Sequence, residues 1–297
     1  MKRHIRIGTL VSLNDPEAAL KKIGIHLKYG FESFSLTFWQ KIGLVDLAEA
    51  ARRVRALTDP AGVPISSLSI FGNPLTGTGD NKGALSGWER LIDAAGLFGT
   101  DLVTGFTGRI VDRPIEESLP AFRDVFGGLA KRAAGKGVRL AFENCPMGGT
   151  WQRGDWNIAI NPDAWKLMFD AVPDANLGLQ WEPCHQMCQL IDPIPQLRRW
   201  APRIFNVHGK DATIAWDVVR ESGAFGQKEF VWHRTPGFGD TNWNDVVTIL
   251  MQAGYQGSID IEGYHDPVHR GDLELAGQVR GLEYLKECRG GDVEETL

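Results

Sequence analysis

Carboxylate and imidazole side chains follow strand-like segments in the second half of the chain. Four consecutive segments of this kind end at Glu143, Glu182, His208 and Glu262. A single buried Glu at a strand end is usually a paired acid of the core. Four such positions in a row instead favour a shared site, since clustered carboxylates repel one another without a cation. Three carboxylates and one imidazole suit Mn²⁺, Mg²⁺ or Co²⁺ with open coordination positions.

The elements that must position these residues alternate along the chain between short β-rich runs and helix-length segments. The predicted strands cover residues 5–10, 33–38, 65–71, 102–106, 140–145, 177–181, 204–208 and 258–263. Helical spacing of apolar residues recurs over 48–57, 121–130, 163–169 and 243–251. Eight strand–helix units in about 290 residues are typical of a (β/α)₈ barrel, in which side chains at the carboxyl ends of the strands converge.

We therefore predict an α/β protein, one TIM-barrel domain over residues 1–297. A doubly wound sheet is the main competitor, but the first strand lacks a G-x-G-x-x-G turn after it. Long loops are expected after strands five and seven, over 147–160 and 212–241.

Composition narrows the classes of protein further. The 297 residues carry 32 Lys+Arg and 37 Asp+Glu, a net charge of −5, which disfavours binding to nucleic acid. No apolar run is long enough for a membrane span or a signal peptide. The four cysteines form no disulfide framework, and Cys184 and Cys188 lack a second Cys pair to complete a zinc site. We expect reduced cysteines and a cytoplasmic protein.

Several motifs resemble those of a known family. They are FENCP (142–146), NIAINP (157–162), NLGLQWEPCH (176–185), IFNVHGKD (204–211), PGFGDTNW (236–243) and IDIE (259–262). In this order they resemble the xylose-isomerase-like TIM barrels, a superfamily of sugar phosphate isomerases and epimerases that also includes AP endonuclease family 2. The resemblance is specific over about 140–267, and earlier residues match only in their strand–helix rhythm.

The resemblance implies a metal held by Glu143, Glu182, His208 and Glu262, with Glu143 and Glu262 also acting as the acid/base pair. One position departs from the family. The family has Asp in an Asp-Pro-Ser-His pattern, whereas this chain has Glu182 followed by Pro-Cys-His. The extra methylene either shifts the geometry of the ligand or accompanies a different substrate class.

The expected function is a divalent-metal-dependent sugar (ketose) isomerase or epimerase, with Mn²⁺ as the expected metal. Proton transfer beside a carbonyl needs a base near the carbon and a positive centre where enediolate charge develops. The alternative keeps the metal and the enolate but expels a leaving group, giving a lyase or glycoside-cleaving enzyme that acts on a keto-sugar glycoside.

Other side chains near these motifs are candidates for binding the substrate. His185, Lys210, His233 and Arg234 could reach substrate oxygens. His185 could instead orient the ligand or pack in the core, Lys210 could pair with Asp211, and the charges of His233 and Arg234 could remain solvated. Tryptophans of the two long loops could stack on a sugar or anchor the loops: Trp151, Trp156, Trp216 and Trp232. Trp181 is expected to point into the core because it alternates with Glu182.

Two further functions remain as alternatives. A phosphodiesterase acting on damaged DNA would need more His and Asp ligands than the chain offers, and a basic surface. A barrel without catalysis would bind no metal and would leave the carboxylate cluster without a purpose. We expect a small non-phosphorylated sugar substrate, a homo-oligomer, and no nucleic-acid or membrane partner.

Overall fold

The computed structural model describes residues 5–77, 82–263 and 265–291. The chain divides into two compact units. The N-terminal unit consists of residues 10–181 and 203–206, and the C-terminal unit of residues 1–9, 182–202 and 207–297. The predicted single domain over 1–297 stays a prediction.

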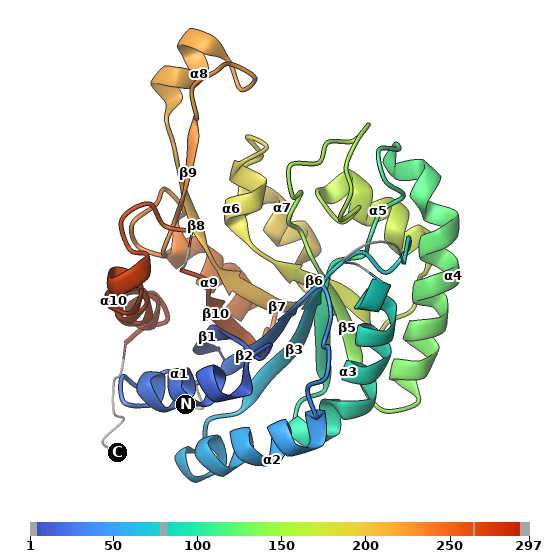
Figure 1. The fold of residues 1–297 in the computed structure, drawn as a ribbon. Coiled ribbons are helices and arrows are strands. Elements are labelled where there is room, and N and C mark those ends of the chain that lie inside the picture. Colours follow the sequence, from blue (N-terminus) through green and yellow to red (C-terminus); the bar gives the residue numbers. More distant parts are fainter. Residues whose placement is uncertain (1–4, 78–81, 264, 292–297) are drawn as a thin grey trace. The chain divides into compact units, whose positions relative to one another are not determined.

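Eight parallel strands carry the fold (Figure 1). They are β1 (Arg6–Ser12), β2 (Phe34–Trp39), β3 (Ile65–Phe71), β4 (Leu102–Gly105), β5 (Arg139–Glu143), β6 (Leu177–Trp181), β7 (Ile204–Gly209) and β10 (Ser258–Ile261). Their hydrogen-bonded order, β1-β10-β7-β6-β5-β4-β3-β2, closes into a barrel. This confirms the predicted (β/α)₈ fold class, and the observed strands lie within two residues of the predicted ones.

Helices follow the strands. They are α1 (Pro16–Leu27), α2 (Leu47–Thr58), α3 (Ala84–Phe98), α4 (Ile115–Ala134), α5 (Pro162–Ala171), α6 (Pro183–Met187), α7 (Pro193–Trp200), α8 (Trp216–Ser222), α9 (Trp243–Gln252) and α10 (Glu274–Cys288). Short polar side chains fix several starts: Asn161 accepts a hydrogen bond from the Ala164 N–H, and Asn242 accepts one from the Asp245 N–H. Within the described residues, none of these helices is both long and apolar enough to cross a membrane.

In the N-terminal unit, the strands have an apolar outer layer and a polar interior. Leu36, Leu68 and Val103 are fully buried. Hydroxyl side chains alternate with them and bond across the strands, Ser35 Oγ to Ser67 Oγ at 2.8 Å and Ser69 Oγ to Thr104 Oγ1 at 2.6 Å. Because a hydroxyl can both donate and accept, these buried groups satisfy each other's hydrogen-bonding capacity and need no charged partner.

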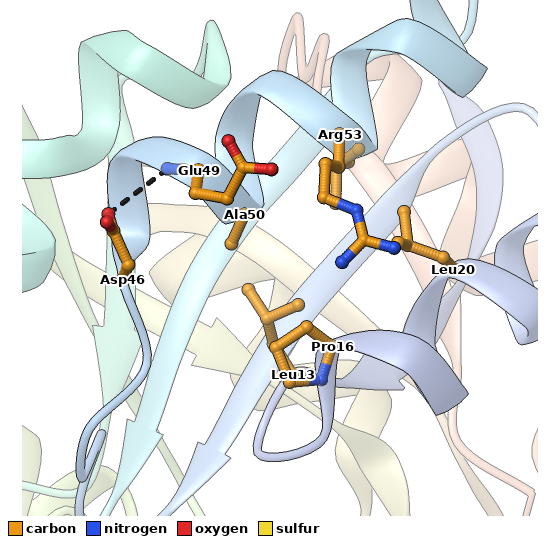
Figure 2. A pocket seen from close by; sticks show the side chains of 8 residues that line it. Leu13, Pro16, Leu20, Asp46, Glu49, Ala50 and Arg53 are labelled. Atoms are coloured by element: carbon orange, nitrogen blue, oxygen red, sulfur yellow. Dashed lines mark hydrogen bonds between the residues drawn. The ribbon is translucent and has the colours of Figure 1, made fainter.

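A cavity of about 110 Å³ lies in the same unit, among residues of α1, α2 and the segments before them (Figure 2). Leu13, Pro16, Leu20 and Ala50 give it apolar walls. Asp46 lines it too, but its carboxylate caps α2 by accepting from the Glu49 N–H. None of the side chains predicted to do chemistry is among the residues that line it.

In the C-terminal unit, β10 pairs with β1 on one side and β7 on the other, and this register places Asp260 beside His208. The segment 212–241, expected to be a loop, contains two strands and a short helix. Strands β8 (Asp211–Ile214) and β9 (Val231–Arg234) form an antiparallel hairpin, with α8 at its tip (Figure 1). Both strands are only four residues long, and most of their side chains are partly exposed. Their sequences therefore lack the buried apolar run by which the barrel strands were predicted.

Candidate active site

Three of the predicted ligands come together in the C-terminal unit. Glu182 directly follows β6, His208 lies in β7, and Glu262 directly follows β10. His208 Nδ1 lies 3.4 Å from Glu182 Oε2 and 3.3 Å from Glu262 Oε2. All three are buried, with exposed fractions of 0, 0 and 5 %. Parallel strands in register bring these ends to one place, as the barrel prediction required.

The two carboxylates are held in their charged form. Burial by itself raises the pKa of Glu182, but the charges of His185 and Lys210 outweigh it and bring the pKa to about 2. Burial acts on Glu262 in the same direction, and there Lys210 and His208 hold the pKa well below its usual range. At neutral pH the cluster therefore contains two buried negative charges.

Lys210 lies inside this cluster. Its Nζ is 2.7 Å from Glu262 Oε1 and 3.5 Å from His185 Nε2, and the residue is only 2 % exposed. The sequence left open a pairing of Lys210 with Asp211. The structure instead pairs Lys210, which lies between β7 and β8, with Glu262 of the neighbouring strand end.

Asp211 supports the surrounding backbone. Its Oδ1 accepts from the Ala212 and Thr241 N–H groups, and its Oδ2 accepts from Trp243 Nε1 at 3.0 Å. A Cβ on Gly239 would come 2.4 Å from Asp211 Oδ1, so the PGFGD turn packs directly on this carboxylate. Asp211 thus anchors the turn and the start of α9.

His185 is joined to the cluster through Glu182. Its Nε2 lies 2.7 Å from Glu182 Oε1, and both side chains are almost fully buried. The contact spans one turn of α6, in which residues three apart share a face. Orientation of a ligand carboxylate was one of the roles expected for His185, and this contact supports it; contact with substrate stays a prediction.

The donor set fits a divalent cation. A ligand atom of each of Glu182, His208 and Glu262 lies within 4.8 Å of the others. Two carboxylate oxygens face one imidazole nitrogen, which has at most one proton to share between them. A cation bound by all three would satisfy both charges at once, and oxygen-rich sites of this kind suit Mg²⁺, Mn²⁺ or Co²⁺.

Glu143 belongs to the N-terminal unit. It ends β5 with a 5 % exposed fraction, and its backbone oxygen accepts a hydrogen bond from Asn157 Nδ2 at 2.8 Å. Asn157 also donates to Cys145 O, so this amide fixes the chain where it leaves the strand. Participation of Glu143 in the metal site stays a prediction.

The buried guanidinium of Arg109 holds the loop that follows β5. Arg109 is fully buried and donates to the backbone oxygens of Thr150, Trp151 and Arg113. The Trp151 indole donates to Glu116 Oε1 at 2.8 Å. Of the two roles expected for Trp151, loop anchoring is therefore supported. Arg109 could not be found from the sequence, because no local pattern marks an Arg as buried.

Trp156 lies in an aromatic group that includes a residue the sequence reasoning missed. Its ring centroid is 5.5 Å from that of Trp39, which ends β2 and is 48 % exposed. Trp156 also packs against a buried cluster that contains Phe71 and Phe106. Trp39 could have been found from its place at a strand's carboxyl end.

Three of the remaining predicted residues, Trp232, His233 and Arg234, lie on β9. The His233 ring is 5.5 Å from that of His185, measured between centroids. Arg234 Nε contacts Asp266 Oδ2 at 3.2 Å, and Asp266 also accepts from three backbone N–H groups. Asp266 thus braces the turn after β10. Trp232 is 41 % exposed on β9, Trp216 is 46 % exposed at the start of α8, and Trp181 is fully buried.

Comparison with known proteins decides the family. The model of the xylose isomerase-like TIM barrels matches residues 25–288. The chain belongs to the xylose isomerase-like TIM barrel family. Among solved structures, this barrel is similar to a 3-keto-D-glucoside 4-epimerase from E. coli, with a TM-score of 0.69, 17 % identity, and coverage of 96 % of this chain and 100 % of that one.

Another similar structure is a xylose isomerase-like TIM barrel protein from Mycobacterium smegmatis in complex with magnesium. Its TM-score is 0.71 at 17 % identity, with 97 % of this chain and 98 % of that one covered. At such identities the likeness shows the fold alone.

Curated relatives of this xylose isomerase-like barrel include an inosose dehydratase of Bacillus thuringiensis (strain Al Hakam). It is 26 % identical over 200 residues, which are 61 % of each chain. An inosose dehydratase of Clostridium tetani is 28 % identical over 190 residues, 60 % of this chain and 59 % of that one. The match thus spans about three fifths of the length of these relatives.

Proposed function

We propose that this barrel is a divalent-metal-dependent enzyme that removes a proton beside the carbonyl of a sugar-like ketone, as a ketose isomerase or epimerase does. The observation that carries the proposal is the convergence of Glu182, Glu262 and His208, with both carboxylates held ionised. We further propose that Glu143 completes the ligand set from β5 and that Mn²⁺ is the native metal.

Glu262, Lys210 and Glu143 would each have a separate role in the proton transfer. A bound divalent cation would polarise the substrate carbonyl and stabilise the negative charge that develops on its oxygen. Glu262 would accept the proton, since its carboxylate is ionised and its depressed pKa can rise once the substrate displaces solvent. Lys210, at 2.7 Å, would orient Glu262 Oε1. In epimerisation, Glu143 would return a proton to the opposite face of the carbon.

A second outcome of the same proton removal is elimination. The two curated relatives described above are inosose dehydratases, and their name describes loss of water from a keto-cyclitol. Elimination needs an acid that protonates the departing oxygen, whereas epimerisation needs an acid that returns a proton to the carbon. Lys210 and His185 are two nitrogen-bearing side chains that could donate it. Dehydration of a keto-cyclitol, or cleavage of a keto-sugar glycoside, is therefore our second candidate function.

One experiment tests the common step and separates the outcomes. Metal-free protein is reconstituted with Mn²⁺, Mg²⁺ or Co²⁺ and incubated in D₂O with ketoses, a keto-glycoside and inosose. Deuterium beside the carbonyl in recovered or epimerised sugar supports the first candidate, and an unsaturated or cleaved product supports the second. Glu262→Gln should abolish both. If no metal is retained after reconstitution, both candidates fail.

We also propose a small sugar or cyclitol as substrate, a homo-oligomeric assembly and a cytoplasmic location. Size measurement in solution tests the assembly, and cell fractionation tests the location.

A further inference from the structure

A second cluster of metal-ligating side chains lies in the C-terminal unit. It consists of Cys184, His185, Cys188 and His233, and each offers one ligand atom within 4.8 Å of the others. Two cysteines without a second Cys pair do not complete a zinc site, but β9 brings His233 to the Cys-x₃-Cys segment. We propose that these four residues form a binding site for a soft divalent cation, Zn²⁺ in particular. This site is distinct from the one formed by Glu182, His208 and Glu262, which we call the oxygen-rich site.

The short helix α6 places both sulfurs together. Cys184 and Cys188 are four residues apart, and the Cys188 N–H donates to Cys184 O at 2.9 Å, so the two side chains share a helical face. All four cysteines of the chain are thiols. Two sulfurs so placed can bind one ion, and each thiol would release its proton on doing so.

The hairpin supplies the third ligand. His233 Nε2 lies 3.5 Å from Cys188 Sγ. The pairing of β8 with β9 sets His233 opposite Ala212, and Ala212 packs against Cys184 and Met187. Because backbone pairing fixes β9, His233 does not depend on a flexible loop for its approach to Cys188.

His185 gives the fourth ligand and links the two sites. Its Nε2 contacts Glu182 Oε1 at 2.7 Å. Histidines that bind metals commonly donate one ring N–H to a carboxylate and ligate through the other nitrogen. His185 has the first half of this arrangement, because its Nε2 contacts the Glu182 carboxylate. Its Nδ1 would then bind the second ion, so the same imidazole would also orient a ligand of the oxygen-rich site.

The chemistry of the surroundings selects the ion. Cys184 is fully buried, and the partly buried Cys188, Ile214 and Val231 pack against its cluster. A set of two thiolates and two imidazoles prefers Zn²⁺ to Mg²⁺ or Mn²⁺, and it matches the tetrahedral Cys₂His₂ combination of closed zinc sites. The oxygen-rich site has no sulfur ligand, so the two sites would sort hard and soft cations.

Cobalt provides a test that does not depend on activity. Metal-free protein, kept reduced without oxygen, is titrated with Co²⁺ alone and followed by absorption. We expect sulfur-to-cobalt charge-transfer bands and intense bands of tetrahedral Co²⁺, which Zn²⁺ then removes. Cys188→Ser and His233→Ala should each lose or strongly weaken these bands, with Zn²⁺ affinity reduced at least about tenfold.

Matched variants keep the result separate from the proposed function. Cys288→Ser removes a thiol of α10 and should leave the bands unchanged. Glu262→Gln disables only the oxygen-rich site and should also keep them. Circular dichroism melts establish that each variant is folded. The inference is overturned if Co²⁺ binds without a thiolate band, if the band survives in Cys188→Ser, or if thiol counting finds a Cys184–Cys188 disulfide under the same reducing conditions.

Discussion

The ammonium of Lys210 lies 2.7 Å from Glu262 Oε1, and both groups are buried. The two residues are 52 positions apart and meet because β7 and β10 are hydrogen-bonded neighbours. A buried charge left without its partner is strongly destabilising, so each group depends on the other. This pair gives the first of four predictions.

Replacing Lys210 with Met should make the metal-free protein more sensitive to acid. Glu182 and Glu262 have folded-state pKa values below the ordinary value of 4.5, so their stabilising effect is present above about that pH and disappears as the pH falls through the folded-state values. Lys210 lowers both pKa values, and its loss raises them. The acid-unfolding midpoint should therefore move to higher pH, measured by circular dichroism.

Lys228→Met is the matched control. Lys228 pairs with Glu221 on the surface, with 63 % of its side chain exposed. An exposed pair of this kind contributes little to stability. An equal shift in both variants would contradict the role given to Lys210.

Shortening Glu182 to Asp should weaken binding of the proposed divalent metal about 10- to 100-fold, even though Asp is the residue found in the family pattern. In this chain the longer side chain reaches His185 at 2.7 Å and faces His208 at 3.4 Å. Removing a methylene withdraws both oxygens from these partners. Calorimetric titration of metal-free protein with Mn²⁺ measures the effect, and unchanged or tighter binding would show that Glu182 is not held as described.

The Trp39–Trp156 pair should bind substrate by stacking. Trp39→Ala is expected to raise KM about 2- to 10-fold with little change in kcat, as the loss of one aromatic contact implies. Trp216→Ala is the control, because Trp216 is similarly exposed, at 46 % against 48 %, but lies at the tip of the hairpin. Steady-state kinetics on the substrate found by the screen would decide. Equal effects would remove the stacking role.

Arg109→Gln should lower the free energy of unfolding by about 2–4 kcal/mol, because it leaves several buried backbone oxygens without a donor. These oxygens belong to Arg113, Thr150 and Trp151. Chemical denaturation measures the loss. Arg153→Gln is the control, since 80 % of that side chain is exposed. Similar losses in the two variants would mean that Arg109 does not hold the loop.

The positions of the strands and the identity of the chemical groups followed from the sequence. Apolar runs alternating with helical spacing predicted the barrel, and Glu182, His208 and Glu262 stood out because each lies at a strand's carboxyl end. The caps at Asn161 and Asn242 are similarly local, because a short polar side chain caps its own helix within three residues.

The tertiary structure decided which distant groups meet. Lys210 contacts Glu262 and not its neighbour Asp211, Arg109 lies beneath a loop some 40 residues later, and His233 approaches Cys188 through a hairpin expected to be a loop. None of these pairings leaves a periodic signal, because each depends on strand register and on which side of a strand a residue faces. Local sequence determined the types of ligand available, and the pairing of strands determined which of them could share an ion.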